Sequence, residues 1–151
     1  MRSLLLALGL SAFLPTFAAA VESTWTTGWK DAAAQATAAK RPILADFTGS
    51  DWCGWCMKLK REVFTTPEFA AWAGRSVVLL EVDFPRAKPL PAEQQRDNQA
   101  LVEKYNVEGF PTILILAADG REIGRLGYQA GGAKAWIAAA EQIIAKGQSP
   151  Q

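Results

Sequence analysis

Apolar residues along this chain form short continuous runs separated by segments with helical spacing. Two continuous runs, 42–47 and 76–83, are typical of strands buried on both faces. A third run at 112–116 predicts another strand, and the weaker alternation of 121–126, after a turn at 118–120, predicts a strand at a sheet edge. These runs are the candidate strands of one sheet.

The segments between and after these strands are rich in alanine or place apolar residues at helical spacing, and they predict helices at 29–40, 53–64, 66–74, 92–105 and 132–146. Thr66 and Pro67 are typical of a helix cap followed by proline at the first helical position. The polar lead-in 21–27 is a candidate edge strand. The order of elements predicts an α/β fold: a central mixed β-sheet with an antiparallel edge hairpin, flanked by helices on both faces.

The first twenty residues differ from the rest. Arg2, an apolar run over 4–14 and small residues up to Ala20 are typical of a secretory signal peptide. The alternative is an uncleaved membrane anchor, but about eleven apolar residues fall short of the roughly 20 needed to span a bilayer. We therefore expect a signal peptide at 1–20, a single domain at 21–151, and an extracytoplasmic location, periplasmic or secreted.

Charge and composition exclude several classes of function and of reactive site. The chain has 16 Lys and Arg against 15 Asp and Glu, and loss of 1–20 removes only Arg2, so the remaining domain is neutral and is not typical of a nucleic-acid-binding protein. There is no histidine, which excludes Ser-His-Asp and Cys-His nucleophilic sites and His-containing zinc sites. The two cysteines, Cys53 and Cys56, remain as the obvious reaction centre.

Cys53 and Cys56 stand three positions apart at the start of the predicted helix 53–64. At this spacing the α-carbons lie roughly 5 to 6 Å apart, within the range of an unstrained disulfide. Cys53 at the helix N-terminus meets unpaired backbone N–H groups, which favour its thiolate. We predict that Cys53 is the nucleophile and Cys56 the resolving thiol. A permanent clamp is the alternative, but so short a loop removes little chain entropy.

Over residues 29–147 the sequence resembles the thioredoxin superfamily, through Asp46-Phe47, Trp52-Cys53-Gly54-Trp55-Cys56, Val82-Asp83, Gly109-Phe110-Pro111-Thr112 and Gly124, in this order. It is most similar to small extracytoplasmic thioredoxin-like proteins and to the soluble domain of thiol:disulfide interchange proteins. The resemblance implies a thioredoxin-like fold and thiol–disulfide exchange on protein or peptide disulfides, with no bound cofactor and no metal.

The resemblance also implies roles for residues around the cysteines. It implies a cis peptide bond before Pro111, in a loop that packs against the cysteines, and backbone groups of Phe110 that pair with an extended substrate segment. Together with Gly54, the aromatic residues Trp52, Trp55 and Phe110 then form a substrate-binding rim. Trp52 is alternatively part of the core, whereas Trp55, between the two cysteines, is expected to be exposed.

Asp46 stands inside an apolar strand, where a carboxylate is costly and its pKa should rise. The resemblance implies that it accepts a proton from Cys56; a hydrogen-bonded structural acid is the alternative. A lysine that pairs with this acid in relatives is matched here by Leu79, so Asp46 should stay protonated more readily. Asp51 is interpreted as a helix cap rather than a catalyst.

The sequence does not determine the direction of exchange. Gly54-Trp55 lacks the histidine of strongly oxidising relatives, which favours a reductase fed by a membrane-bound or soluble thiol donor. We expect the protein to be a monomer. One alternative is a Cu(I)-binding protein, since thiolates suit soft metals, although Met57 is the one methionine after residue 20. Another is a redox-inactive interaction module with a permanent disulfide.

The segment 84–91 contains three prolines and two basic residues, Arg86 and Lys88. It follows a buried strand expected to run parallel to the strand that enters the cysteine turn, so both connections should emerge at the same edge of the sheet. One hypothesis is that this stiff, positive loop belongs to the substrate platform. The alternative is a surface loop that merely tolerates insertion.

Overall fold

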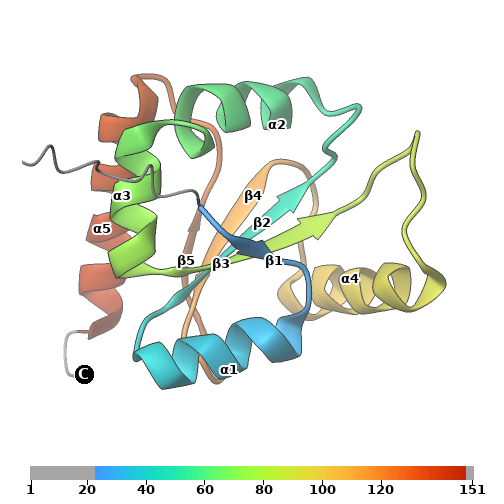
Figure 1. Ribbon diagram of the computed structural model, residues 1–151, viewed down its shortest axis with the longest axis horizontal. Coiled ribbons are helices and arrows are strands. Elements are labelled where there is room, and N and C mark those ends of the chain that lie inside the picture. Colours follow the sequence, from blue (N-terminus) through green and yellow to red (C-terminus); the bar gives the residue numbers. More distant parts are fainter. Residues whose placement is uncertain (1–22, 149–151) are drawn as a thin grey trace, which may run out of the picture.

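Five strands form one mixed sheet in the computed structural model, which describes residues 23–148 (Figure 1). The strands are β1 (Trp25–Thr26), β2 (Ile43–Thr48), β3 (Val78–Asp83), β4 (Thr112–Leu116) and β5 (Glu122–Leu126), and their order is β1-β3-β2-β4-β5. Strands β1, β2 and β3 run parallel to one another. Strand β4 runs antiparallel to β2, and β5 runs antiparallel to β4. The mixed sheet and its edge hairpin confirm the predicted fold class. The expected signal peptide at 1–20 lies outside the described residues.

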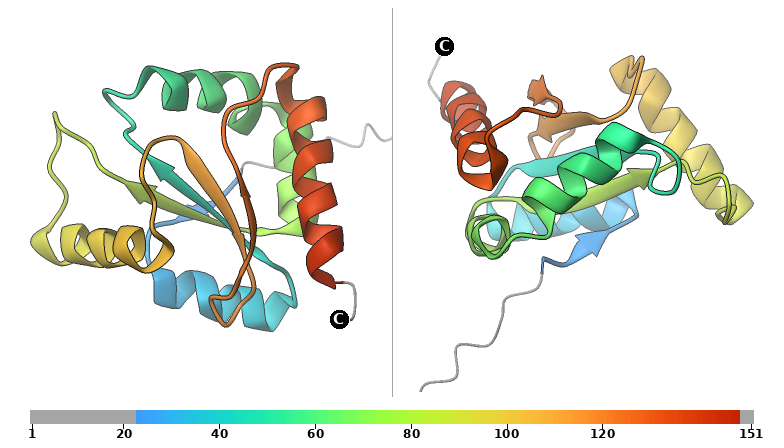
Figure 2. Two further views of the ribbon diagram at one scale, coloured as in Figure 1. Left: turned by 180° about the vertical axis from the view of Figure 1, so that it is seen from behind. Right: turned by 90° about the horizontal axis from the view of Figure 1, so that it is seen from above.

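Helices cover both faces of this sheet (Figures 1 and 2). Helices α1 (Trp29–Ala39) and α4 (Ala92–Tyr105) pack on one face. The other face carries α2 (Gly54–Leu59), its π-helical continuation η1 (Lys60–Phe64), α3 (Pro67–Ser76) and α5 (Gly132–Gln148). No helix within residues 23–148 combines the length and the apolar character required to cross a bilayer.

Strand β2 lies at the centre of the sheet, between β3 and β4, and all six of its residues are buried. Because side chains alternate along a strand, Leu44 packs beneath α3 and α5 while Ile43 and Ala45 pack beneath α1 and α4. Because both faces of the strand are buried, most of its residues are apolar. The same alternation places Asp46, two positions after Leu44, on the face that also carries α2.

An aromatic cluster fixes the far end of the α2–η1 helix. The ring of Phe64 lies 4.8 Å from that of Phe69 and 5.4 Å from that of Trp136, which comes from α5. All three side chains are buried, and the Trp136 indole N–H donates to the Gly127 carbonyl at 3.0 Å. Three helices are thus packed on one face of the sheet, and the helix that begins at the cysteines has a rigid base.

The helix predicted from the cysteines onward stops and restarts at Thr65 and Thr66, as the sequence predicted. Thr66 is the N-cap of α3: its hydroxyl accepts the Phe69 N–H at 3.3 Å and donates to the Val63 carbonyl at 2.6 Å. One side chain therefore joins the end of η1 to the start of α3, and Pro67 occupies the first turn.

We expect Thr66→Ala to lower the free energy of unfolding by about 1 kcal/mol, because both hydrogen bonds of the cap are lost. Thr66→Ser keeps the hydroxyl and is the matched control. Urea unfolding of the oxidised protein, followed by tryptophan fluorescence, measures both variants. Equal stability of the Ala and Ser variants would show that the cap contributes nothing.

Candidate active site

Cys53 and Cys56 form a disulfide where the turn after β2 enters α2, with their α-carbons 5.2 Å apart. Cys53 is the N-cap of α2, and its sulfur accepts the backbone N–H of Cys56 at 3.2 Å. The pair therefore lies on the first helical turn, as predicted. Cys53 and Cys56 are 6% and 4% exposed, so little of either residue is open to solvent in the oxidised form.

The turn that carries Cys53 depends on a glycine. The Gly49 carbonyl accepts the N–H groups of Trp52 and Cys53 at 3.3 and 2.9 Å, which closes the turn. A Cβ atom at Gly49 would collide with the indole ring of Trp52. Only glycine allows this approach, so Gly49 sets where Trp52 stands beside the cysteines.

The loop before β4 contains a cis peptide bond between Phe110 and Pro111, as the resemblance implied. The ring of Phe110 lies 6.1 Å from that of Trp52 and stacks on Phe84 at 5.2 Å. Trp52 is 37% exposed, so it borders the surface rather than lying in the core. Three aromatic residues from three separate connections thus meet beside the turn that carries Cys53.

Trp55 lies apart from this group. It is 57% exposed, as expected, and its ring contacts Tyr128 at a centroid distance of 5.0 Å. The Lys58 ammonium stands 5.0 Å from the Trp55 ring and 4.8 Å from the Tyr128 ring, and the Tyr128 hydroxyl donates to Glu62 at 2.8 Å. The predicted rim therefore has two separate parts, one with Trp52 and Phe110 and one with Trp55. Sequence reasoning missed Tyr128, which lies over 70 residues further along the chain and carries no local signal.

Asp46 is buried in β2, and burial raises its pKa from 3.8 to about 8, with Glu81 and Asp83 adding to the rise and Lys60 opposing it. Its Oδ1 atom has no hydrogen-bond partner among the described residues. The direction of this pKa shift agrees with the sequence analysis. Asp46 therefore spends most of its time protonated at neutral pH.

The neighbours of Asp46 on β3 are acids. The strand register places Glu81 directly beside Asp46, with Leu79 beside Leu44 in the core. Burial raises the pKa of Glu81 as well. Sequence reasoning compared Asp46 with Leu79 and overlooked Glu81 and Asp83, although strand alternation from Leu79 would have put both acids on the same face. The positive charge that opposes the rise in pKa of both Asp46 and Glu81 comes from Lys60 on η1, not from a residue of β3.

The interpretation of Asp51 as a helix cap was wrong, because the sulfur of Cys53 takes that position. The Asp51 carboxylate accepts the backbone N–H groups of Arg86 and Ala87 at 2.9 and 2.7 Å, and these hydrogen bonds lower its pKa. Asp51 therefore fastens the cysteine turn to the 84–91 loop. Its partners are 35 and 36 residues away, so no local pattern could reveal them.

Within the described part of the chain, no three His, Cys, Asp or Glu side chains come together in a way that could hold a metal ion.

Comparison with protein families identifies a match over residues 29–143 to a model described as a thioredoxin-like domain. Among curated proteins, the chain is similar to the disulfide bond reductase DsbH of Chlamydia pneumoniae, with 38% identity over 69% of this chain and 63% of the relative. It is also similar to the thioredoxin-related protein DsbJ of the same organism, with 33% identity over 78% of this chain and 35% of that protein. The aligned region thus spans less than two thirds of either relative.

Comparison with solved structures gives the same picture. A structure described as DsbH oxidoreductase superposes with a TM-score of 0.81 and 32% identity, over 91% of this chain and 94% of that one. A thioredoxin from Thermus thermophilus superposes with a TM-score of 0.63 over 84% of this chain and 91% of that one, at 22% identity, which is a likeness of fold.

The raised pKa of Asp46 predicts how stability depends on pH. The folded protein holds a proton at pH values where the unfolded chain, with a pKa of about 3.9, has released it. Stability linked to Asp46 is therefore fully present below about pH 4 and is lost as the pH rises towards about 8. We expect Asp46→Asn to change unfolding little at pH 4 and to stabilise the oxidised protein by about 2 to 4 kcal/mol at pH 8.

Chemical unfolding at a series of pH values between 4 and 8 measures this difference. Asp97→Asn, which removes an exposed carboxylate from α4, is the matched control and should show no such trend. A gain in the Asp46 variant that does not grow with pH would contradict the raised pKa.

Proposed function

Because this chain belongs to the family of thioredoxin-like domains, we propose that it is a thiol–disulfide oxidoreductase acting on protein or peptide disulfides. One observation carries the proposal: the cysteine pair stands at the start of α2, with a backbone N–H directed at the sulfur of Cys53. A backbone donor at this position stabilises a thiolate, which is the reactive form in disulfide exchange.

The reducing direction begins with both cysteines reduced. The thiolate of Cys53 attacks one sulfur of the partner's disulfide, the partner's S–S bond breaks, and its second sulfur leaves as a thiolate. Cys56 then loses its proton and attacks the sulfur of Cys53, which releases the first partner sulfur. Two electrons have passed to the partner, both of whose sulfurs end as thiols after protonation, and this chain ends as the disulfide seen in the structure.

We assign Asp46 the role of proton acceptor for Cys56. With a pKa of about 8, both the protonated and the ionised form of Asp46 are populated near neutral pH, as a proton-transfer group requires. The charge of Lys60 favours the ionised form, which partly replaces the lysine that relatives carry on the neighbouring strand. The burial of Asp46 and its orphaned oxygen support a role beyond stability, because an unpaired buried carboxylate destabilises the fold.

Substrate binding is assigned to the residues around the disulfide. Backbone groups of Phe110 and the cis Pro111 loop would pair with an extended substrate segment, with Trp52 beside them. Gly54 is exposed, with open space where a side chain would stand, so a substrate backbone can approach the cysteines there. Trp55, which is exposed between the two cysteines in the chain, adds a further apolar ring.

Reduction is the favoured direction. The Gly54-Trp55 pair carries no histidine, and a relative bears the name disulfide bond reductase. A reductase needs an electron donor, for which a second thiol protein, membrane-bound or soluble, supplies the matching chemistry. The signal-peptide pattern of 1–20 supports an extracytoplasmic location, and a monomer suffices for the proposed chemistry.

The division of labour between the thiols predicts opposite behaviour of two variants. Cys56→Ser should accumulate a mixed disulfide with a peptide disulfide substrate, because nothing resolves it, whereas Cys53→Ser should not. Non-reducing electrophoresis and intact mass measure the adduct. In the reduced wild-type protein, alkylation at neutral pH should reach Cys53 first. Adducts formed by Cys53→Ser alone would reverse the assignment.

The direction predicts a reduction potential. Equilibration of the Cys53–Cys56 pair with a glutathione redox buffer should give a value near about −270 mV, typical of reducing family members, rather than about −120 mV, typical of strong oxidants. A value at the oxidising end would make this protein an oxidase while leaving the exchange chemistry intact.

A further inference from the structure

We propose that the surface around the disulfide selects partner segments that carry acidic residues on both sides of the reacting cysteine. The inference deepens the proposed function and rests on it. The selecting groups are two tryptophan–cation pairs, Trp52 with Arg86 and Trp55 with Lys58, which we call the paired-cation rim.

The first pair stands on the 84–91 loop side of the disulfide. The Arg86 guanidinium carbon lies 3.9 Å from the centre of the Trp52 ring, a stacked cation–π arrangement. The Trp52 indole N–H donates to the Phe84 carbonyl at 2.7 Å, which fixes the ring on which Arg86 rests. A stacked guanidinium keeps its charge and its N–H donors, so it can still bind a carboxylate.

Arg86 is held in this place by the backbone of its loop. Asp51 accepts the N–H groups of Arg86 and Ala87, and Ser50 binds both carboxylate oxygens of Asp83 at 2.9 and 2.5 Å. The cysteine turn and the start of the loop are therefore joined at several points. A loop fastened in this way presents its cation at a defined position, which lowers the entropy cost of binding a partner.

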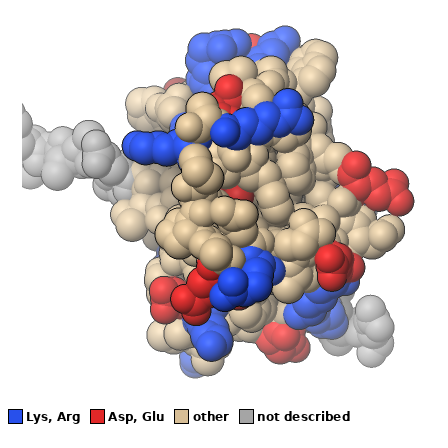
Figure 3. Space-filling model, turned by 90° about the vertical axis from the view of Figure 1, so that its right-hand side faces the viewer, with Lys and Arg blue, Asp and Glu red and all other residues tan. Residues whose placement is uncertain are grey.

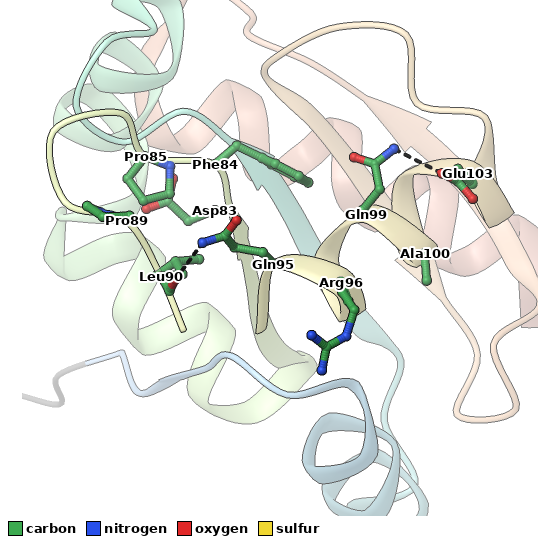
Figure 4. Close-up of a pocket in the computed structure, with 10 residues that line it drawn as sticks. All are labelled: Asp83, Phe84, Pro85, Pro89, Leu90, Gln95, Arg96, Gln99, Ala100 and Glu103. Carbon is green, nitrogen blue, oxygen red and sulfur yellow. Dashed lines mark hydrogen bonds between the residues drawn. The ribbon is translucent and has the colours of Figure 1, made fainter. Parts of the chain in front are cut away.

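The loop is supported on its outer side as well. Gln95 of α4 donates to the Leu90 carbonyl at 2.6 Å, and a cavity of about 540 Å³ lies between the loop and α4 (Figure 4). The charged residues that line it include Arg96 and Glu103, of opposite sign, together with Asp83. The cavity thus lacks the excess of positive charge found on the rim, so we assign the charge selection to the rim.

The second pair stands in the segment between and after the two cysteines, where Trp55 precedes Cys56 and Lys58 follows it. Lys58 lies over both the Trp55 and Tyr128 rings, and Tyr128 is held in turn by its hydrogen bond to Glu62. Trp52, Trp55 and Met57 are the exposed large hydrophobic residues of the described chain, and the two tryptophans are the ones that carry the cations. Each cysteine thus follows a tryptophan that carries a cation: Trp52 with Arg86 before Cys53, and Trp55 with Lys58 before Cys56.

Charge complementarity identifies the partner. The segments 51–62 and 84–91 carry five basic side chains, Lys58, Lys60, Arg61, Arg86 and Lys88, and two acidic ones, Asp51 and Glu62. Asp51 accepts the backbone N–H groups of Arg86 and Ala87, and Glu62 accepts the Tyr128 hydroxyl. With both acids counted, basic side chains still outnumber acidic ones by five to two in these segments.

The excess of positive charge is local, because the chain as a whole is close to neutral. Figure 3 shows this face from the side of the loop and α4: basic side chains dominate its upper part, whereas the lower part mixes both signs. Such a surface attracts acidic segments and repels basic ones.

The test compares three peptide disulfides of one sequence in which the residues flanking the cysteine are Asp, Ser or Lys. We expect kcat/KM to fall in the order Asp, Ser, Lys, with about tenfold between the first and the last at low salt and a smaller ratio at high salt. Lys58→Gln and Arg86→Gln should each lower the Asp-to-Lys ratio roughly two- to fivefold. Because the ratio is taken within each variant, a general loss of activity cancels.

Two further variants sharpen the test. Lys146→Gln removes a basic residue from the last turn of α5, at the opposite end of the molecule from α2, and should leave the ratio unchanged (Figure 1). Asp51→Asn removes a negative charge but keeps an oxygen for the loop amides, so it should raise the ratio. Equal rates for the three peptides, or an equal effect of Lys146→Gln and Lys58→Gln, would overturn the inference.

A neutral aromatic disulfide separates this inference from the proposed function. If the reduced wild-type protein reduces the aromatic reagent and the three peptides alike, the exchange chemistry stands and the charge selection is wrong. If it reduces none of them, the proposed function itself fails and the inference fails with it.

Discussion

The pairing of β2 with both of its neighbours is the constraint on which the rest of the structure depends. The strand is parallel to β3 and antiparallel to β4, so its end brings together the connections that leave β3 and enter β4. In the register, Thr48 pairs with Asp83, directly before the 84–91 loop, and Phe47 pairs with Thr112, directly after the cis proline. A slip of one residue would exchange the faces of every β2 side chain and would move Asp46 away from the helix that carries the cysteines.

The same strand contains the main conflict between stability and chemistry. A carboxyl group at position 46 is buried and lies beside Glu81, so its ionised form destabilises the fold, and an apolar residue would fit this strand better. The proton transfer that we propose for Asp46 would be a reason to keep an acid at this costly position. Lys60 moderates that cost from η1 without entering the core.

The surface around Trp52 is assembled from connections that are remote in sequence. Trp52 and Asp51 come from the turn after β2, Arg86 from the loop after β3, and Phe110 from the loop before β4. Aromatic contacts and backbone hydrogen bonds join these segments, so the surface is rigid although most of it is loop. A surface fastened in this way loses little conformational entropy when a partner binds.

The sequence by itself determined the elements and the reaction centre, because both depend on local patterns. The strands follow from continuous apolar runs, the helix restart from the Thr66 cap, and the first-turn disulfide from the spacing of the two cysteines. Each of these patterns spans only a few residues of the chain.

Only the tertiary structure decided which side chains meet. The tie from Asp51 to the 84–91 loop, the pairing of Asp46 with Glu81 and the contact of Trp55 with Tyr128 join residues 35 to 73 positions apart. Strand register and loop path place these groups side by side, and neither leaves a periodic signal in the chain.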